Sequence, residues 1–190
     1  MKLSEWKRRA GVVAEVLPQY RPMRFGFVRF DEWIAAGYYV DSSAFSSAAF
    51  YVQAFAMPRF VPADSLYFDY GFRVNGRWEE VGPDLAGAVA AAEPRLAEVA
   101  TLDGLRAEAS EQQRNINHVE VHLCTAVLTR EESSFIEMKR AALNLVPEVP
   151  WEADVRNRCI ELAELVEDQG FEAGEAILTG RRGEVDRLLA

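Results

Sequence analysis

Hydrophobic and polar residues alternate from Leu66 to Val74, where every second side chain is aromatic or aliphatic. Alternation of this kind places the apolar side chains on one face of a β-strand. Asn75-Gly76 follows at once, and this dipeptide is a strong hairpin signal because a type I′ turn needs positive φ at both central residues. The pattern predicts an aromatic hairpin in which Phe68 and Phe72 are nearly buried.

Three further β-like runs precede this hairpin, at residues 24–30, 37–40 and 48–57. Short links join them, which favours an antiparallel meander of four or five strands over a parallel sheet. An amphipathic pattern from Leu3 to Leu17 predicts a leading helix that Pro18 ends. The residues from Asp31 to Ile34 are compatible with a helical turn before the second run.

The apolar period changes to three and four residues after Gly82-Pro83, which predicts helices in the rest of the chain. Pro94 lies inside the first helical stripe and is expected to kink or split that helix. We therefore expect an α+β protein with a sheet region at 1–82 and an acidic all-helical region at 83–190 packed on it, or one compact domain of both. The expected helix boundaries are Thr101, Asn117, a capping box from Thr129 to Glu132, Pro147, Pro150, Gly170 and Gly180.

Two of the expected helix starts, near Asn117 and Trp151, are 34 residues apart. This spacing resembles the period of tetratricopeptide repeats, which are helical hairpins. The consensus Trp, Leu, Gly and Tyr positions of that repeat are not reproduced, so the resemblance implies a bundle of helical hairpins and nothing about a partner.

The net charge of −9 is concentrated in one half of the chain, because residues 101–190 hold 18 acidic and 10 basic side chains. An acidic surface repels phosphate backbones and favours basic protein partners, so nucleic acid is not an expected ligand. A solvated face that only keeps the protein soluble is the alternative. The candidate partner-binding residues are Glu152, Glu161, Glu164, Glu167 and Asp168.

Several functional classes lack their sequence signals. No stretch approaches the ~20 apolar residues of a membrane span, and the first residues lack the apolar core of a signal peptide. Cys124 and Cys159 are far apart within helical patterns, which predicts buried reduced thiols. Phosphate-binding glycine loops and nucleophile elbows are missing as well. We expect a cytoplasmic protein without a cofactor, and a composition poor in lysine favours a bacterial source.

The run from Phe25 to Phe30 reads FGFVRF and resembles the aromatic ribonucleoprotein motif of RNA-recognition domains. In that family the aromatic rings stack on bases across an open sheet. Arg24 stands where the motif has glycine, and Met23 stands where it has a basic residue. The alternative is that Phe25, Phe27 and Phe30 belong to the core of an aromatic sheet.

Both histidines of the chain lie in one short run, with His118 and His122 separated by four residues and Glu120 between them. On a helix the two histidines share a face, and on a strand all three side chains do. Either arrangement supplies zinc-type ligands, which suggests a metal-dependent hydrolase. Two partly exposed helical histidines without a metal are the alternative.

A third candidate site lies on the sheet. Tyr67, Asp69 and Arg73 alternate with the apolar positions of the hairpin strand, and Tyr51 and Gln53 lie on the preceding run. Hydroxyl, carboxylate and guanidinium groups on a rigid sheet form a ligand-binding surface, or else ordinary cross-strand pairs.

The composition and charge together favour a non-enzymatic bacterial interaction protein of the immunity or antitoxin type, which docks a basic partner through its acidic helical face. The alternatives are the metal-dependent hydrolase of His118, Glu120 and His122, and a small-molecule binding module on the sheet.

Overall fold

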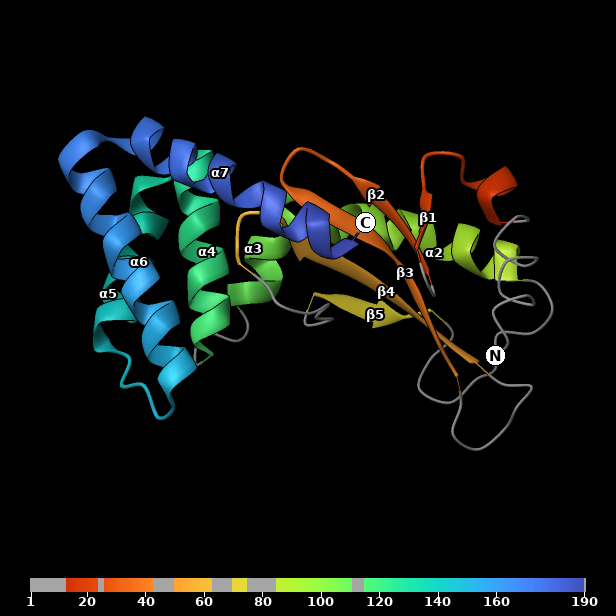
Figure 1. The fold of residues 1–190 in the computed structure, drawn as a ribbon, viewed down its shortest axis with the longest axis horizontal. Coiled ribbons are helices and arrows are strands. Elements are labelled where there is room, and N and C mark those ends of the chain that lie inside the picture. The colour runs from red at the N-terminus through yellow and green to blue at the C-terminus, as the bar shows by residue number, and fades with distance from the viewer. Residues whose placement is uncertain are drawn as a thin grey trace. The chain divides into compact units, whose positions relative to one another are not determined.

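The chain is an α+β protein with an N-terminal five-stranded antiparallel sheet followed by helices, as the sequence predicts (Figure 1). The computed structural model describes residues 13–23, 26–42, 50–62, 70–74, 85–110 and 115–189. The sheet and the first long helix form one compact unit, here called the sheet unit. The remaining helices and the segment that begins at Pro58 form a second, here called the helical unit.

The sheet is a meander in which each strand neighbours the next along the chain, in the order β1-β2-β3-β4-β5. Val28 of β2 lies opposite Gly37 of β3, and Gln53 of β4 lies opposite Arg73 of β5. The third strand is longer than expected and begins at Ile34, so the alternative of a helical turn at this position is wrong. The strands are β1 Arg21–Met23, β2 Gly26–Phe30, β3 Ile34–Ser42, β4 Phe50–Pro58 and β5 Gly71–Arg73.

Aromatic side chains form the core of the sheet unit, where Phe27, Tyr38 and Phe55 are fully buried. Gly37 lets the strands and this core pack closely, because a Cβ at that position would meet the Phe27 carbonyl oxygen and lie 3.0 Å from the Phe55 ring. The expectation for Phe72 is wrong. Its side chain is half-buried, with the Arg95 guanidinium 4.0 Å from the ring centroid.

The turn and the other half of the predicted hairpin, including Phe68 and Asn75-Gly76, lie outside the described residues. Likewise, the leading helix is described only from Val13, where residues 13–16 are helical and the Leu17 amide donates to the Val13 carbonyl at 2.8 Å.

Helix α2, Leu85–Val99, contains Pro94 without being split. It belongs to the sheet unit and lies against one face of the sheet (Figure 1). Val89 and Leu96 are fully buried on either side of the proline. Anchorage on both sides holds the helix together although Pro94 lacks a backbone donor, so the expected splitting is wrong.

The helical unit is built from five helices in the described residues. Figure 1 shows α4 and α6 running side by side, and α4 packs against α3, α5 and α6. The bounds are α3 Leu102–Ser110, α4 Ile116–Thr129, α5 Glu132–Asn144, α6 Pro150–Gln169 and α7 Phe171–Leu189. Nearly every residue of α4 from Ile116 to Val127 is buried, which makes it the centre of this unit.

Several predicted helix ends are confirmed and others are wrong. Pro150 is the first residue of α6, and Gly170 ends it with φ 90°, a backbone conformation that favours glycine. Gly180 lies inside α7 and is not a cap. The N-cap of α4 is Asn115, whose side-chain oxygen accepts from the Asn117 amide at 3.0 Å.

The predicted capping box from Thr129 to Glu132 is also wrong. Thr129 is the last residue of α4, and its hydroxyl donates to the Thr125 carbonyl at 3.0 Å. Arg130 then takes a left-handed conformation, and Glu131 precedes α5 without a side-chain capping bond. A left-handed residue closes α4 here, so the two helices meet with almost no loop between them.

Among the described residues, no helix combines the length and the apolar character that crossing a membrane requires.

Candidate functional site

Three of the five acidic residues proposed for partner binding form one exposed face of α6. Glu161, Glu164 and Asp168 are all exposed, and their spacing of three and four residues places them on the same side of the helix. We call these three residues the α6 acidic face. Carboxylates at this spacing repel one another unless cations lie nearby.

The other two acidic residues have local structural roles. The Glu152 carboxylate accepts from the Glu148 amide at 2.6 Å, and the Val149 amide lies 3.4 Å from the same oxygen. It therefore caps the start of α6, where backbone amides lack helical partners. Glu167 pairs with the Lys139 ammonium of α5. Both carboxylates therefore already have a bonding partner within the helical unit.

The only two basic residues of α6 point away from its acidic face. The Arg156 guanidinium donates to the carbonyls of Ala142 and Leu143 at 3.1 Å each and so caps the end of α5. Arg158 donates to both oxygens of Glu120 at 2.8 Å. No cation of α6 itself therefore compensates the acidic face.

The residues proposed for metal binding lie in the buried helix α4 and do not converge. His118 and His122 share one face of α4, but Glu120 lies on another, with its side chain 1% exposed. Its carboxylate is held by Arg158 in a bidentate pair, and an Arg181 nitrogen lies 3.9 Å away. The described residues contain no group of three His, Cys, Asp or Glu side chains placed to hold a metal ion.

The two histidines are buried, so the alternative of partly exposed helical histidines is wrong. The His122 Nδ1 lies 3.4 Å from the Ser110 hydroxyl, while its buried Nε2 has no hydrogen-bond partner among the described residues. Burial lowers the pKa of His122, and the nearby Glu137 carboxylate opposes this shift. The neutral imidazole is the form that the fold accommodates.

Both cysteines are buried and not disulfide-bonded, as the sequence predicts. Burial raises the pKa of Cys159 to about 12 and raises that of Cys124 well above its usual value, with the Glu120 charge adding to both shifts. Each thiol therefore stays protonated at neutral pH, and neither supplies a thiolate nucleophile.

The structure brings together the described part of the proposed sheet site. Gln53 lies opposite Arg73 in the register of β4 and β5, and the Arg73 guanidinium lies 5.1 Å from the centroid of the Tyr51 ring. The other two members of that proposal, Tyr67 and Asp69, lie outside the described residues. The arrangement is a cation–π pair beside an amide on one face of the sheet.

The described aromatic rings of the run that resembles the ribonucleoprotein motif do not offer an exposed surface on which bases could stack. Phe27 is fully buried and Phe30 half-buried, whereas base stacking needs exposed rings. Phe27 is a core residue, as the alternative interpretation predicts, and Phe25 lies outside the described residues.

A polar cluster that the sequence reasoning missed lies between α2 and the sheet. The Glu93 carboxylate accepts from the Tyr20 hydroxyl at 2.7 Å and from the Tyr38 hydroxyl at 2.8 Å. An Arg29 nitrogen lies 4.0 Å from the same carboxylate. Burial, followed by the hydrogen bond to Glu93, raises the pKa of both tyrosines. The phenols remain donors at all physiological pH values, so the cluster fixes α2 to the sheet.

One feature of the sequence marks this cluster. The apolar residues Val89, Ala92 and Leu96 of α2 face the sheet, and Glu93 lies among them in the sequence. A carboxylate at such a position needs a hydrogen-bond donor. The pattern places Glu93 on the side of α2 that faces the sheet but does not identify Tyr20 and Tyr38, which are 73 and 55 residues away in the chain.

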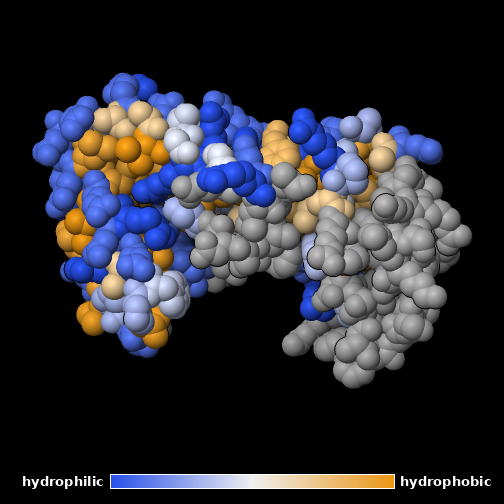
Figure 2. All heavy atoms as spheres, viewed as in Figure 1, coloured by the Kyte–Doolittle hydropathy of each residue, from blue (hydrophilic) through white to orange (hydrophobic). Residues whose placement is uncertain are grey.

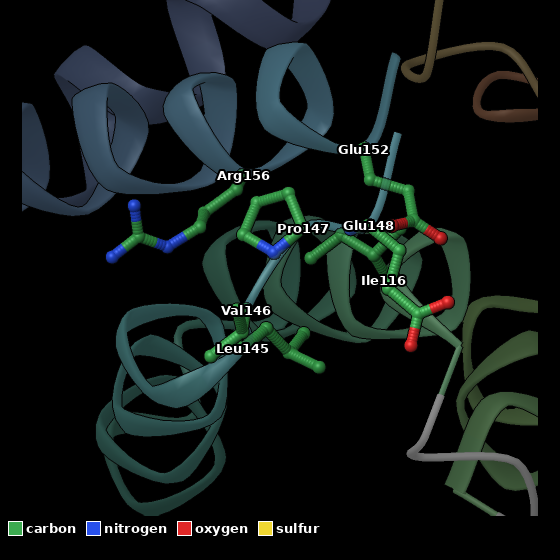
Figure 3. A pocket seen from close by; sticks show the side chains of 7 residues that line it. All are labelled: Ile116, Leu145, Val146, Pro147, Glu148, Glu152 and Arg156. Atoms are coloured by element: carbon green, nitrogen blue, oxygen red, sulfur yellow. Dashed lines mark hydrogen bonds between the residues drawn. The ribbon is translucent and has the colours of Figure 1, made fainter. Parts of the chain in front are cut away.

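A small pocket lies beside the loop between α5 and α6 (Figure 3). Its volume is about 170 Å³, and Ile116, Leu145, Val146 and Pro147 supply the apolar part of its lining. Figure 3 shows the Glu148 and Glu152 carboxylates on one side of Pro147 and the Arg156 side chain on the other.

Apolar side chains also reach the surface at this loop. Val146 is 83% exposed, and Leu143, Val149 and Trp151 are exposed by 41% to 50%. We call these four residues the α5–α6 apolar patch. Figure 2 shows that apolar surface is interrupted by strongly hydrophilic residues over the helical unit.

No protein-family model matches the chain, and neither a curated protein nor a solved structure matches it significantly.

Proposed function

We propose that this protein is a non-enzymatic interaction protein whose helical unit docks a basic protein partner through the α6 acidic face. One observation carries the proposal: both basic residues of α6 are bound elsewhere, Arg156 by α5 carbonyls and Arg158 by Glu120, while Glu161, Glu164 and Asp168 are exposed. A basic partner relieves the repulsion among these carboxylates. Inhibitors of basic proteins, such as nuclease immunity proteins or antitoxins, are the class that this arrangement suits.

The polar clusters of the interior support a binding role over a catalytic one. Glu93 and Glu120 are held by tyrosine or arginine side chains, and both cysteine thiols stay protonated at neutral pH. A general base or nucleophile must reach a substrate, and these groups are occupied within the fold.

The test compares two charge-reversed variants of the protein. Glu161→Lys with Glu164→Lys reverses the acidic face, and Glu15→Lys with Glu98→Lys makes the same change of net charge on exposed residues of the sheet unit. A partner is recovered from the source cell with wild type, purified, and its association rate measured at low and high salt. The first variant should slow association by about tenfold or more at low salt, since charge steers encounter. The second variant should leave the rate near that of wild type, and equal effects of both variants would reject the acidic face.

A second candidate function is supported by the pairing on the sheet. The Arg73 guanidinium lies 5.1 Å from the Tyr51 ring, beside Gln53, and together they offer a cation, a ring and an amide on one rigid surface. We propose that this surface binds a small anionic aromatic ligand. Screening such ligands by NMR against wild type and Arg73→Gln tests the idea, and binding that is equal in both would end it.

A further inference from the structure

The α5–α6 apolar patch lies at the start of the same helix whose second half carries the acidic face. Leu143, Val146, Val149 and Trp151 expose large apolar side chains over a stretch of nine residues. Single exposed apolar residues are ordinary, whereas several exposed ones within one short segment make that segment a candidate interaction surface. Elsewhere on the described helices of this unit most large apolar residues are buried, as Phe135 and Met138 are on α5, and the exposed ones, Ile136 and Ile177, stand singly.

The pocket supplies a place for one side chain of a partner. Ile116, Leu145, Val146 and Pro147 line it together with Glu148, Glu152 and Arg156, and about 170 Å³ accommodates one branched aliphatic side chain against the apolar part of that lining. Buried apolar anchors in such pockets dominate the binding energy of protein interfaces. Val146 belongs both to the pocket lining and to the patch, so the two features form one surface.

Charge decides the kind of partner that this surface suits. The stretch from Val146 to Asp154 contains Glu148, Glu152 and Asp154 and no basic residue. Arg156, which lines the pocket, already donates to two α5 carbonyls. A segment that covers the patch must therefore be apolar where it meets Val146 and positively charged at its rim.

We infer that the α5–α6 apolar patch is the docking site for a basic amphipathic helix, which inserts one aliphatic side chain into the pocket and places lysine or arginine beside Glu148. This inference rests on the proposed function and locates the anchor of the same partner. The acidic face steers the partner to α6, and the apolar patch holds it after contact. The first contribution acts on association and the second on dissociation.

The test uses a synthetic helical peptide of leucine and lysine arranged on two faces, labelled for fluorescence anisotropy. A leucine and glutamate peptide of the same pattern is its counterpart. Val146→Asp alters the most exposed residue of the patch, so the fold should tolerate it, and circular dichroism verifies this. Ile177→Asp on α7 is the matched control, because Ile177 is exposed to a similar degree as the rest of the patch but lies on another helix.

The leucine and lysine peptide should bind wild type and the Ile177→Asp variant equally, and bind Val146→Asp about tenfold or more weakly through faster dissociation. Equal binding to Val146→Asp would overturn the inference, and so would equal binding of the glutamate peptide. Sedimentation that shows wild type dimerising and Val146→Asp monomeric would overturn it too, because the occupant would then be a second copy of the chain.

The two proposals fail in different ways in this experiment. Weaker binding by Glu161→Lys with Glu164→Lys, together with no effect of Val146→Asp, supports the acidic face and overturns the apolar anchor. The opposite result supports the anchor and rejects the acidic face as the steering surface.

Discussion

Each of the two units of this protein holds an acidic side chain against its interior, and they do so in different ways. In the sheet unit, Glu93 accepts from two tyrosine hydroxyls, with the nearest arginine nitrogen at 4.0 Å. In the helical unit, Glu120 is held in a bidentate pair by Arg158. The Glu93 side chain is 21% exposed, whereas that of Glu120 is 1% exposed.

The difference shows how burial determines the kind of partner that a carboxylate needs. A partly solvated carboxylate such as Glu93 is satisfied by neutral donors, because water still screens its charge. A completely buried one requires an opposite charge with good hydrogen-bond geometry, and then both charges depend on each other. The predictions below test this dependence.

The largest effect is expected for Glu120→Gln, which leaves the shape of the side chain but removes its charge. Arg158 then loses its counter-charge inside the unit, and the free energy of unfolding should fall by about 3 to 5 kcal/mol. Urea unfolding followed by circular dichroism measures the change, and Glu161→Gln on the exposed face should change it by no more than about 0.5 kcal/mol. A loss at Glu120 as small as that at Glu161 would mean that the pair is not a structural requirement.

Packing of α7 against α4 and α6 is tested by Gly174→Ala in α7. A Cβ at this position would lie 2.6 Å from a Val166 methyl carbon and 2.8 Å from one of Val127. Overpacking of this kind should cost about 1 to 3 kcal/mol in unfolding free energy.

Gly180→Ala is the matched control on the same helix, because a Cβ there meets no atom within 4 Å. Alanine should stabilise this helical position by up to about 1 kcal/mol. If Gly174→Ala also stabilises the protein, α7 does not pack closely against Val127 and Val166.

A smaller loss is expected for Glu93→Gln. The amide oxygen of glutamine still accepts from Tyr20 and Tyr38, and Arg29 keeps the Asp31 carboxylate 4.0 Å away as a counter-charge, so unfolding should become easier by only about 1 kcal/mol. The same urea titration measures it. A cost equal to that of Glu120→Gln would remove the proposed distinction between neutral and charged partners.

The smallest effect concerns pH and His122. Burial lowers the pKa of His122 below its usual value near 6.5, so the unfolded chain binds this proton more readily than the folded protein does. The contribution of His122 to stability is therefore complete above pH ~6.5 and is lost as the pH falls towards and through its lowered folded pKa. Unfolding midpoints between pH 7 and pH 5 should decline less steeply in His122→Gln than in wild type, and parallel curves would contradict the assignment.

Local pattern in the sequence was sufficient for the kind and order of the elements of this fold, although it misplaced several of their ends. Alternation predicted the antiparallel meander, the period of three and four predicted the helices, and Pro150 and Gly170 marked the ends of α6. These signals are short-range, because strand faces, helix stripes and caps depend on residues within a few positions of each other. The same argument predicted the buried thiols, since both cysteines occupy apolar stripes.

Tertiary structure alone decided which polar side chains bond to other residues of the protein and which face the solvent. Glu152 and Glu167 follow the same acidic pattern as Glu161, yet one caps α6 and the other pairs with Lys139. Glu120 and Arg158 are 38 residues apart, and Tyr20 and Glu93 are 73 apart. The alternation of hydrophobic and polar residues likewise does not predict that Phe72 is half-buried beneath Arg95. These pairings depend on which elements pack together, and no local period in a single sequence encodes the distance between two side chains that lie far apart along the chain.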